Sequence, residues 1–407
     1  MKVVIAGINY APELTGISPY TTALAEHLAS EGHAVSVVCG RPSYPHWRVH
    51  DDYRGLIARR ERINDVDVHR RWNFVPRSQS AILRGAYEAS YGITGALIPG
   101  LGDADAFVGI VPSLSGGVLA RMWGTFFRKP YGVLFQDLLG PASAQSGISG
   151  GSAVAKAVAK TEGWVARGAR RVAVVADGFR SYLHQAGVPD ERIMRVRNWT
   201  HIPTSTRDRD VVRKEFEWGP DQIVCLHAGN MGYKQALENI VEAARLLEAN
   251  AWIQFVLVGD GSQRQELEDR ARGLTNLTFT PLQPDELFAD ILAAADILLL
   301  NQRTTVEDMS LPGKLTSYFA SGRPVVAAVA ATSESALEIL AARAGIVVEP
   351  EMPRELADAI QRLTSSPEEM TQLGRCGRLF AETTLAAPAA LARLTEFLQE
   401  VIEKRVD

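Results

Sequence analysis

The chain has few of the features that mark several large classes of protein. Only three cysteines occur among 407 residues, Cys39, Cys225 and Cys376, and they lie far apart without CxxC spacing. We therefore expect neither a disulfide framework nor a thiolate metal site, but buried thiols in a reducing compartment. The net charge is −4 and no block of like charge occurs. A protein that tracks a nucleic-acid backbone needs a basic stripe, so we expect no nucleic-acid partner.

Long apolar runs are also missing. The longest uncharged stretch, Leu138–Ala155, is rich in Gly, Ser and Pro, and the first residues lack a cationic segment followed by an apolar run. We expect no membrane span and no signal peptide. The predicted location is the cytoplasm, with at most a peripheral contact to the inner face of the cytoplasmic membrane.

What the chain does have is the composition and the pattern of a globular α/β protein. Hydrophobic residues make up 46% and charged residues 22%, and the length suggests two domains of about 200 residues each. Short β-branched runs alternate with segments of helical apolar spacing, which predicts parallel sheets covered on both faces. The predicted strands are 3–7, 35–38, 106–111, 131–135, 171–175, 193–196, 223–228, 255–259, 277–280, 297–300 and 325–328. The predicted helices are 18–30, 235–249, 263–272, 285–294, 314–321 and 388–404.

The pattern restarts after a polar stretch, Pro203–Asp210, which we interpret as an interdomain linker. We predict an N-terminal Rossmann-like domain over residues 1–203, a C-terminal Rossmann-like domain over 204–387, and a final helix in 388–407 that packs back towards the first domain. Ligands of doubly wound sheets bind at the carboxyl ends of the strands. Two such domains in tandem predict a ligand cleft facing both sheets.

The first strand is followed by a loop that contains Gly16, just before a helix with Ser18 as the expected N-cap and Pro19 at its first helical position. A glycine there lets backbone N–H groups approach an anion, although it could equally serve only to turn the chain. The GxGxxG fingerprint is missing from this loop, which argues against NAD or FAD.

Two loops in the second half carry lysines, which are rare in this chain: eight lysines stand against 35 arginines. The strand 223–228 runs into a glycine-rich turn that ends at Lys234, and Pro312–Gly313–Lys314 opens a later helix. Amide donors, a helix dipole and an ammonium together suit a diphosphate. The alternative for Lys234 is a solvated surface lysine. We find no HxxxH, DxD or clustered Cys/His set that is suited to hold a metal, so we expect no metal and no cofactor.

At these residues the chain resembles the retaining GT-B glycosyltransferases of glycosyltransferase family 4, and within them the colanic-acid and O-antigen fucosamine branch. The similar blocks cover nearly the whole chain. They are GINYAPELTGISPYT at 7–21, PSYPHW at 42–47, VPSL at 111–114, RNWTHI at 197–202, GNMGYKQALENIVEAA at 229–244 and LPGKLT at 311–316.

The resemblance implies a GDP-, UDP- or dTDP-sugar donor held mainly by the second domain. The residues that match the family's donor site are Gly16, Gly229, Asn230, Lys234, Gly259, Asp260, Asp308, Leu311, Pro312, Gly313, Lys314 and Ser317. The family pattern also has two glutamates with seven residues between them, and here Met309 and Ser317 take their places. Asp308 is expected to substitute in part for the missing glutamates. Asn230 stands where the family commonly has a basic residue, so Lys234 has less help from a neighbouring positive charge.

The implied reaction is retaining transfer of a hexosyl or deoxyhexosyl group to an acceptor hydroxyl, in bacterial polysaccharide, glycolipid or glycoconjugate biosynthesis. Lys234, Lys314 and Asp137 are the predicted catalytic residues, although Asp137 could be a helix cap. The acceptor is a saccharide, a lipid-linked molecule or a small molecule. The predicted acceptor-side residues are Tyr10, Glu13, Tyr44 and Trp47, with a packed loop as the alternative. The alternative functions are a sugar-nucleotide epimerase of the same architecture and a non-catalytic nucleotide-sugar-binding subunit.

A membrane contact is suggested by segments that mix apolar and basic side chains, which a lipid-linked acceptor would require at a membrane. An ordinary amphipathic helix would explain these segments equally well. They comprise Trp123, Phe126, Phe127, Arg128 and Lys129, and then Lys156, Lys160, Trp164, Arg167, Arg170 and Arg171.

Overall fold

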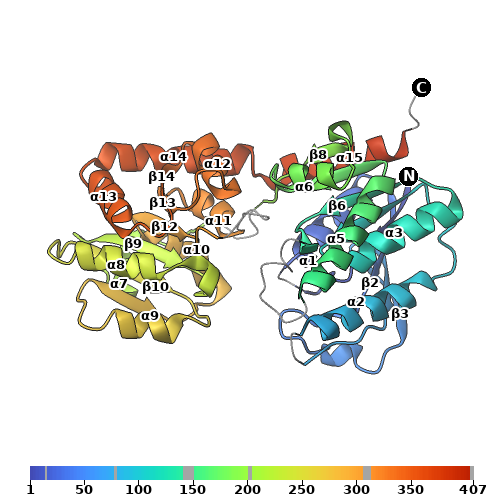
Figure 1. The fold of residues 1–407 in the computed structure, drawn as a ribbon, viewed down its shortest axis with the longest axis horizontal. Coiled ribbons are helices and arrows are strands. Elements are labelled where there is room, and N and C mark those ends of the chain that lie inside the picture. The colour runs from blue at the N-terminus through green and yellow to red at the C-terminus, as the bar shows by residue number, and fades with distance from the viewer. Residues whose placement is uncertain (14–15, 78–79, 141–150, 200–203, 306–312, 404–407) are drawn as a thin grey trace. The chain divides into compact units, whose positions relative to one another are not determined.

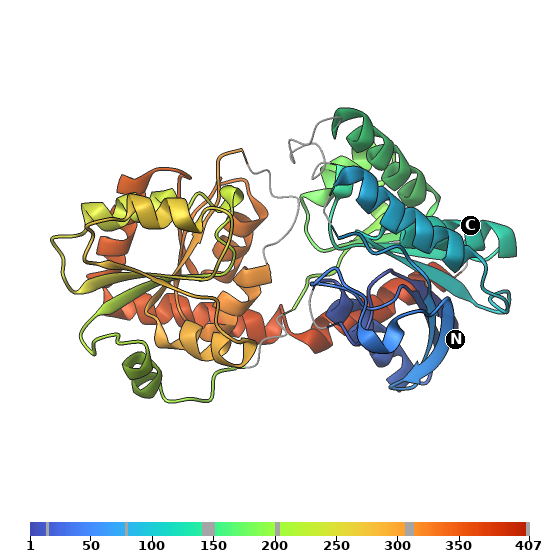
Figure 2. The same ribbon diagram turned by 90° about the horizontal axis from the view of Figure 1, so that it is seen from below.

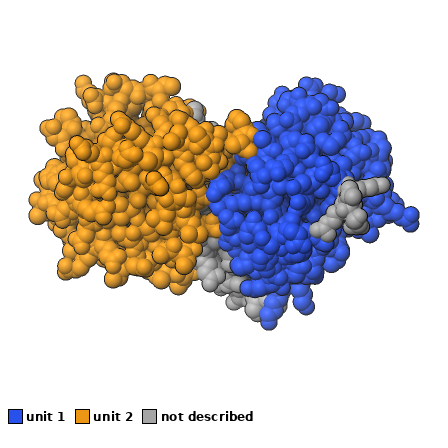
Figure 3. Space-filling view, turned by 90° about the horizontal axis from the view of Figure 1, so that it is seen from above, with its two compact units in different colours: residues 1–197, 390–407 blue, residues 198–389 orange. Residues whose placement is uncertain are grey.

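The computed structural model, drawn in Figures 1 and 2, describes residues 1–13, 16–77, 80–140, 151–199, 204–305 and 313–403. The chain divides into two compact units (Figure 3). The first comprises Met1–Arg197 together with Ala390–Asp407, and the second comprises Asn198–Ala389.

The first unit is an α/β sandwich around one eight-stranded sheet of order β3-β4-β2-β1-β5-β6-β7-β8. All neighbours pair in parallel except β3 and β4. The strands are β1 Lys2–Ala6, β2 Ala34–Cys39, β3 Ala58–Ile63, β4 Val66–Arg71, β5 Ala106–Val111, β6 Tyr131–Phe135, β7 Arg171–Val174 and β8 Ile193–Arg195. The helices are α1 Ser18–Ser30, α2 Ala81–Ala96, α3 Leu114–Phe127, α5 Gly151–Gly168, α6 Phe179–Gln185 and α15 Ala387–Ile402.

Helices cover both faces of this sheet. Helices α2, α3 and α5 lie side by side on one face (Figure 1), and α3 approaches β5 so closely that a Cβ on Gly109 would lie 2.7 Å from Gly117 Cα. Helices α1 and α15 cover the other face, where His27 of α1 lies 3.1 Å from the Thr395 hydroxyl of α15. Helix α15 thus packs against β6, since a Cβ on Gly132 would clash with Phe397.

The first unit differs from the sequence prediction in several places: helices α2, α3, α5 and α6 were not among the predicted helices, and a strand pair and a helix cap also differ. The antiparallel pair β3–β4 was not predicted, because its strands are rich in charge and half-exposed at the edge of the sheet. Its two-residue turn, Asn64–Asp65, has positive φ at both positions, as tight hairpins require. The N-cap of α1 is Ile17 and makes no side-chain cap bond, so the prediction of Ser18 was wrong. Ser18 is instead the first helical residue and is buried.

The second unit contains an all-parallel six-stranded sheet of order β11-β10-β9-β12-β13-β14. The strands are β9 Ile223–Ala228, β10 Ile253–Val258, β11 Leu277–Thr280, β12 Ile297–Asn301, β13 Val325–Ala328 and β14 Gly345–Val348. The helices are α7 Arg209–Glu215, α8 Glu238–Leu246, α9 Arg264–Arg270, α10 Asp285–Ala294, α11 Gly313–Ser321, α12 Glu334–Ala342, α13 Pro353–Thr364 and α14 Pro367–Thr383.

Alternate residues of the strands belong to two different apolar cores in this unit. Leu226 and Leu298 belong to the core under α10, α11 and α12. Cys225 and Ile297 belong to the core under α8 and α13. From the central pair β9–β12, the strand order runs to β10 and β11 on one side and to β13 and β14 on the other. The topological switch point therefore lies at the carboxyl ends of β9 and β12.

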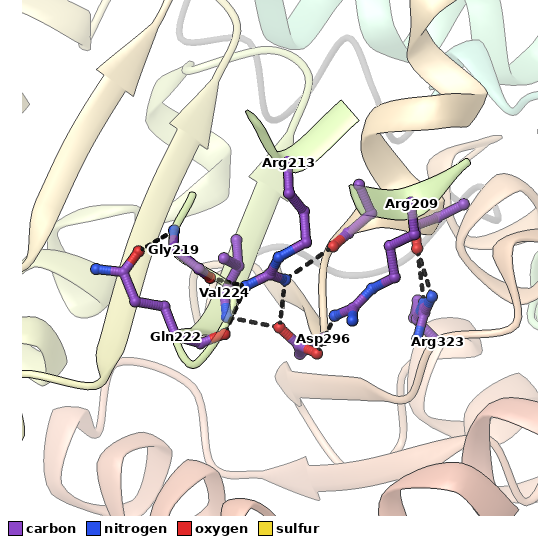
Figure 4. A network of polar contacts seen from close by, with 9 residues as sticks. Arg209, Arg213, Gly219, Gln222, Val224, Asp296 and Arg323 are labelled. Atoms are coloured by element: carbon purple, nitrogen blue, oxygen red, sulfur yellow. Dashed lines mark hydrogen bonds and ion pairs between the residues drawn. The ribbon is translucent and has the colours of Figure 1, made fainter. Parts of the chain in front are cut away.

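A buried ionic network fixes the opposite, amino end of β9 and β12 (Figure 4). Asp296 accepts hydrogen bonds from the Val224 backbone N–H at 2.9 Å and from Arg213 at 3.0 Å, and it is paired with Arg209. Arg213 also donates to the carbonyl oxygens of Gly219 and Gln222 at 2.6 Å. Arg209 begins α7, so this helix occupies the last part of the stretch predicted as a linker.

Candidate functional site

The loops that follow β9 and β10 pack backbone against backbone at the switch point. Gly229, Gly259 and Gly261 have φ values of +130°, +145° and +156°. A Cβ on Gly259 would lie 1.9 Å from the Gly229 carbonyl oxygen, and one on Gly261 would lie 2.5 Å from that of Met231. Only glycine fits this geometry, so these residues allow the two loops to pack directly against each other.

Lys314, in the first turn of α11, places its ammonium beside this glycine turn. Its Nζ lies 3.3 Å from the position a Cβ on Gly229 would take. The Nζ is buried and has no hydrogen-bond partner among the described residues. Burial lowers the pKa of Lys314 to about 8. A covered ammonium without a counter-ion is unfavourable by itself, so the site fits an anion brought by a ligand.

Lys234 is exposed and lies in a short 3-10 turn, Tyr233–Gln235. The helix predicted to begin at Gln235 begins only at Glu238, because Ala236 adopts a left-handed conformation with φ +45°. Arg303 anchors the turn, since its backbone N–H donates to the Lys234 carbonyl oxygen at 3.0 Å. Its guanidinium also lies 3.9 Å from the centroid of the Tyr233 ring. The backbone of Lys234 is therefore fixed while its ammonium faces solvent.

Three further buried polar side chains near these strand ends were missed by the sequence analysis. Asn301 ends β12 and is 1% exposed, and neither its Oδ1 nor its Nδ2 has a hydrogen-bond partner among the described residues. Asn239, in the first turn of α8, is also buried, and neither polar atom of its side-chain amide has a hydrogen-bond partner among the described residues. His227 is buried on β9, and burial together with the charge of Lys314 lowers its pKa well below the usual value. For Asn301 and His227 the signal in the sequence was a polar residue within an apolar strand.

The remaining predicted donor residues are placed as follows. Gly313 begins α11, and its carbonyl oxygen accepts a hydrogen bond from the Thr316 hydroxyl at 2.7 Å. Ser317 is buried on the same helix. Asn230 and Asp260 are exposed on the two glycine loops. Predicted residues that lie outside the described part of the chain are Asp308, Leu311 and Pro312.

In the first unit, Glu13 joins two loops at the carboxyl edge of the sheet. Its Oε1 accepts the backbone N–H groups of Ser43 and Tyr44 at 2.7 and 2.8 Å, and its Oε2 accepts the Asn9 amide at 2.8 Å. Burial raises the pKa of Glu13. Gly16 lies against the same loop, since a Cβ on this residue would lie 3.0 Å from the Tyr44 ring. Its φ of +67° is in the left-handed region that favours glycine. Glu13 thus positions this loop, and a contact of Glu13 with an acceptor stays a prediction.

The second loop carries a cluster of aromatic rings. Trp47 packs edge-on against Tyr44, with ring centroids 6.1 Å apart, and against Tyr87 of α2 at 5.4 Å. The Arg84 guanidinium lies 5.4 Å from the centroid of the Trp47 ring. Tyr87 and Arg84 were not predicted, because their helix is separated from this loop in the sequence. Partly exposed aromatic faces of this kind suit a sugar.

Tyr10 and Asp137 were also predicted as contact residues. Tyr10 is fully buried, its hydroxyl has no hydrogen-bond partner among the described residues, and burial raises its pKa. Asp137 follows β6 and is partly exposed, and its Oδ1 accepts the Leu138 backbone N–H at 2.8 Å. Asp137 is therefore placed at the open edge of the sheet, whereas Tyr10 lies beneath the surface.

Within the described ranges, no three His, Cys, Asp or Glu residues are grouped as metal ligands would be. The same residues include no helix that is both long and apolar enough to span a membrane.

Comparison with known proteins gives matches to both halves of the chain. The family model described as "Glycosyl transferase 4-like domain" matches residues 15–199, and "Glycosyl transferases group 1" matches residues 222–366. The chain is 31% identical, over 95% of its length and 96% of the relative's, to a protein of Escherichia coli K12 named as the colanic acid biosynthesis glycosyl transferase WcaI.

A second relative, a GDP-mannose-dependent α-(1-6)-phosphatidylinositol dimannoside mannosyltransferase of Mycobacterium tuberculosis, is 29% identical over 46% of the chain and 47% of its own length. Among solved structures, Anabaena HepE in complex with UDP-glucose superimposes with a TM-score of 0.66 at 16% identity. That alignment covers 98% of this chain and 99% of HepE, and it shows a shared fold.

Proposed function

The chain belongs to the glycosyltransferases that combine a 4-like domain with a group 1 domain, and from this premise we propose its donor, its mechanism and its place of action. The donor is a nucleoside-diphosphate sugar, and the transferred group is a hexosyl or deoxyhexosyl unit. Relatives with GDP-mannose or UDP-glucose in their names support this choice of donor class. The name of the Escherichia coli relative supports a role in bacterial polysaccharide biosynthesis.

The observation that carries the proposal is the buried ammonium of Lys314 beside the Gly229 turn, which has no hydrogen-bond partner in the part of the chain that the structure describes. A diphosphate brings the negative charge that this ammonium lacks, and its oxygen atoms can accept the backbone N–H groups of the glycine loops. Lys234 adds a second cation on the same edge of the sheet. Such fixed donors typically contribute about 3 kcal/mol each where charge develops in the transition state.

The proposed reaction retains the anomeric configuration. The bond between the anomeric carbon and the donor phosphate oxygen breaks, and the acceptor oxygen forms its bond to the same face of that carbon. The acceptor proton passes to the departing diphosphate, so no carboxylate nucleophile is needed. Lys314 and Lys234 stabilise the leaving group. The proposal includes no metal and no cofactor, and it predicts full activity in the presence of EDTA.

The first unit supplies the acceptor side in this proposal. The partly exposed rings of Tyr44 and Trp47 offer apolar faces to a saccharide or to the sugar of a lipid-linked acceptor, and the buried Tyr87 supports Trp47 from α2. We assign the partly exposed carboxylate of Asp137 to substrate contact. The protein acts in the cytoplasm with a peripheral contact to the inner face of the membrane. An epimerase is not favoured, since the relatives and the family models are those of transferases.

The test is a thermal-shift panel of GDP-, UDP- and dTDP-sugars followed by substitution of the exposed lysine. The correct donor stabilises the protein by about 2.7 kcal/mol at a hundredfold excess over Kd. Lys234→Ala is expected to lower kcat/KM by about 100-fold. The matched control is Lys214→Ala, another exposed lysine of the second unit, which should leave activity unchanged. Full transfer activity in Lys234→Ala would remove the diphosphate assignment, and conversion of the donor without any acceptor would indicate an epimerase.

A further inference from the structure

We propose that the second unit holds a phosphate site at the amino end of its sheet, opposite the strand ends to which we assign the donor. Its ligand is inorganic phosphate or the phosphate group of a small metabolite. The inference does not depend on the proposed function. It is carried by a polar cavity, by guanidinium N–H groups that lack an acceptor in the described chain, and by a surplus of positive charge around one buried carboxylate.

A cavity of about 190 Å³ opens beside the ionic network of Asp296. The side chains that matter to a ligand there are arginines and serines from three separate segments, namely Ser205, Arg207, Arg209, Ser321, Arg323 and Arg378. At about 30 Å³ for each water molecule, the cavity has room for about six of them. It therefore fits an anion of five heavy atoms, such as phosphate, and is too small to enclose a nucleotide.

Three of the lining arginines keep N–H donors that no residue of the described chain accepts. Arg323 donates through Nε and Nη2 to one backbone carbonyl oxygen, at 2.9 and 2.5 Å, which leaves Nη1 without an acceptor. Arg209 is paired with Asp296 through Nη2, and its Nε has no partner. Arg378 is exposed and lies 3.6 Å from Glu382. A guanidinium presents five donors in a planar fork, so the unused ones suit phosphate oxygens.

The buried charges beside the cavity are not balanced. Arg209 and Arg213 share one buried carboxylate, that of Asp296, and Arg323 forms no ion pair with a described acid. These side chains are drawn together in Figure 4. Burial and then the positive charge of Arg209 lower the pKa of Arg323. A phosphate in the cavity would offset this repulsion between like charges.

The other acids near the cavity are already engaged. Asp290 is buried in its lining and accepts the Ser205 hydroxyl at 2.7 Å. Arg207 lies 4.0 Å from Asp290 and is also paired with Glu215. These acids offset one lining arginine and leave the other three available to a ligand.

The position of the cavity along the chain suggests what a bound phosphate does. The chain passes between the two compact units after Arg197 and again after Ala389. Arg207 and Arg209 lie soon after the first passage, and Arg378 lies on α14, shortly before the second. A phosphate held by these arginines ties both segments to the same strand ends. We therefore expect its effect on stability, without its being consumed.

The experiment is calorimetric titration of the full-length protein with inorganic phosphate, and in a second arm with glycerol 3-phosphate, both at constant ionic strength. We expect saturable binding at one site. Arg378→Gln removes one charge-assisted partner and should weaken binding about tenfold. Arg323→Gln added to Arg378→Gln should abolish it. The matched control is Arg375→Gln, which changes another exposed arginine of α14 that does not line the cavity.

The two arms distinguish the sources of the phosphate group. Tighter binding of glycerol 3-phosphate would support a phosphorylated metabolite as the ligand, and tighter binding of inorganic phosphate would support the free ion. Without phosphate, Arg378→Gln should be at least as stable in urea as the unmodified protein, because one of the repelling charges is gone. This measurement shows that a loss of binding is not a loss of folding.

Three results would overturn the proposal: no saturable binding by the unmodified protein, an equal loss in Arg375→Gln, or unchanged binding in the double variant. Lys234→Ala separates this site from the donor site and should bind phosphate as the unmodified protein does. Loss of binding in Lys234→Ala together with full binding in Arg378→Gln would place the phosphate at the donor loops and refute the second site. A failure of the proposed donor in the thermal-shift panel would leave this site untouched.

Discussion

The ammonium of Lys314 gives the sharpest test of the candidate site, because its burial links stability, pH and ligand binding. Burial lowers the pKa of Lys314 from 10.5 to about 8. At 1.36 kcal/mol per unit, the folded state therefore holds this charge at a cost of about 3 kcal/mol. Below pH 8 the group is protonated in both the folded and the unfolded chain, and the full cost is present. As the pH rises from 8 to 10.5 the folded protein loses the proton before the unfolded chain does, so stability rises.

The perturbation is Lys314→Met, which keeps the length of the side chain and removes the charge. We expect the free energy of unfolding of the unliganded protein at pH 7 to rise by about 3 kcal/mol, measured by urea denaturation. We also expect the difference between the variant and the unmodified protein to shrink as the pH rises through 8 to 10.5. Binding of the nucleoside diphosphate should be lost in the same variant, so that the substitution stabilises the protein and inactivates it.

Proton uptake on binding gives an independent measure. At pH 8 about half of the Lys314 side chains are neutral, and a bound diphosphate favours the charged form. Calorimetry in two buffers of different ionisation enthalpy should therefore show uptake of about half a proton at pH 8. A variant less stable than the unmodified protein, or binding without proton uptake, would refute the assignment of an anion site at this lysine.

Three further substitutions test how the two units are built. Asp296→Ala leaves buried cations without their carboxylate and should lower the free energy of unfolding by about 3–5 kcal/mol in denaturation. Gly259→Ala places a methyl group 1.9 Å from the Gly229 carbonyl oxygen. We therefore expect the free energy of unfolding to fall by more than about 3 kcal/mol and the donor-induced thermal shift to be lost. An unchanged thermal shift would show that the loop is free to move. Glu13→Gln can keep an oxygen for the Ser43 and Tyr44 N–H groups, but it then turns an amide donor towards the Asn9 amide donor; the change should cost about 2 kcal/mol in urea denaturation, without loss of donor binding.

Much of the fold follows from local pattern. The helices α1 and α10 and the strands β5, β6, β11 and β13 have the predicted bounds, because a buried parallel strand is a short apolar run and its flanking helix shows apolar spacing. The pair β3–β4 was not predicted, because its strands at the edge of the sheet are rich in charged residues and lack the apolar run that marks a buried strand. The start of α8 was misplaced because one left-handed residue, Ala236, interrupts an otherwise helical pattern.

The candidate site was found from the sequence only in part. Lys234, Lys314 and the glycine turns were identified by residue type, the scarcity of lysine and a resemblance to a family. The burial of the Lys314 ammonium could not be identified in that way, nor could the amide of Asn301, which has no hydrogen-bond partner among the residues described. The same holds for Tyr87 and Arg84, which reach Trp47 from a different segment.

The sequence by itself determined where strands and helices alternate and which turns need glycine, because these depend on neighbours a few residues away. Tertiary structure alone decided which charges lose their water and which side chains stay exposed. The pKa of Lys314 and the apolar outer side of α2 are both sums over contacts with segments distant in the chain, and no local pattern contains those contacts.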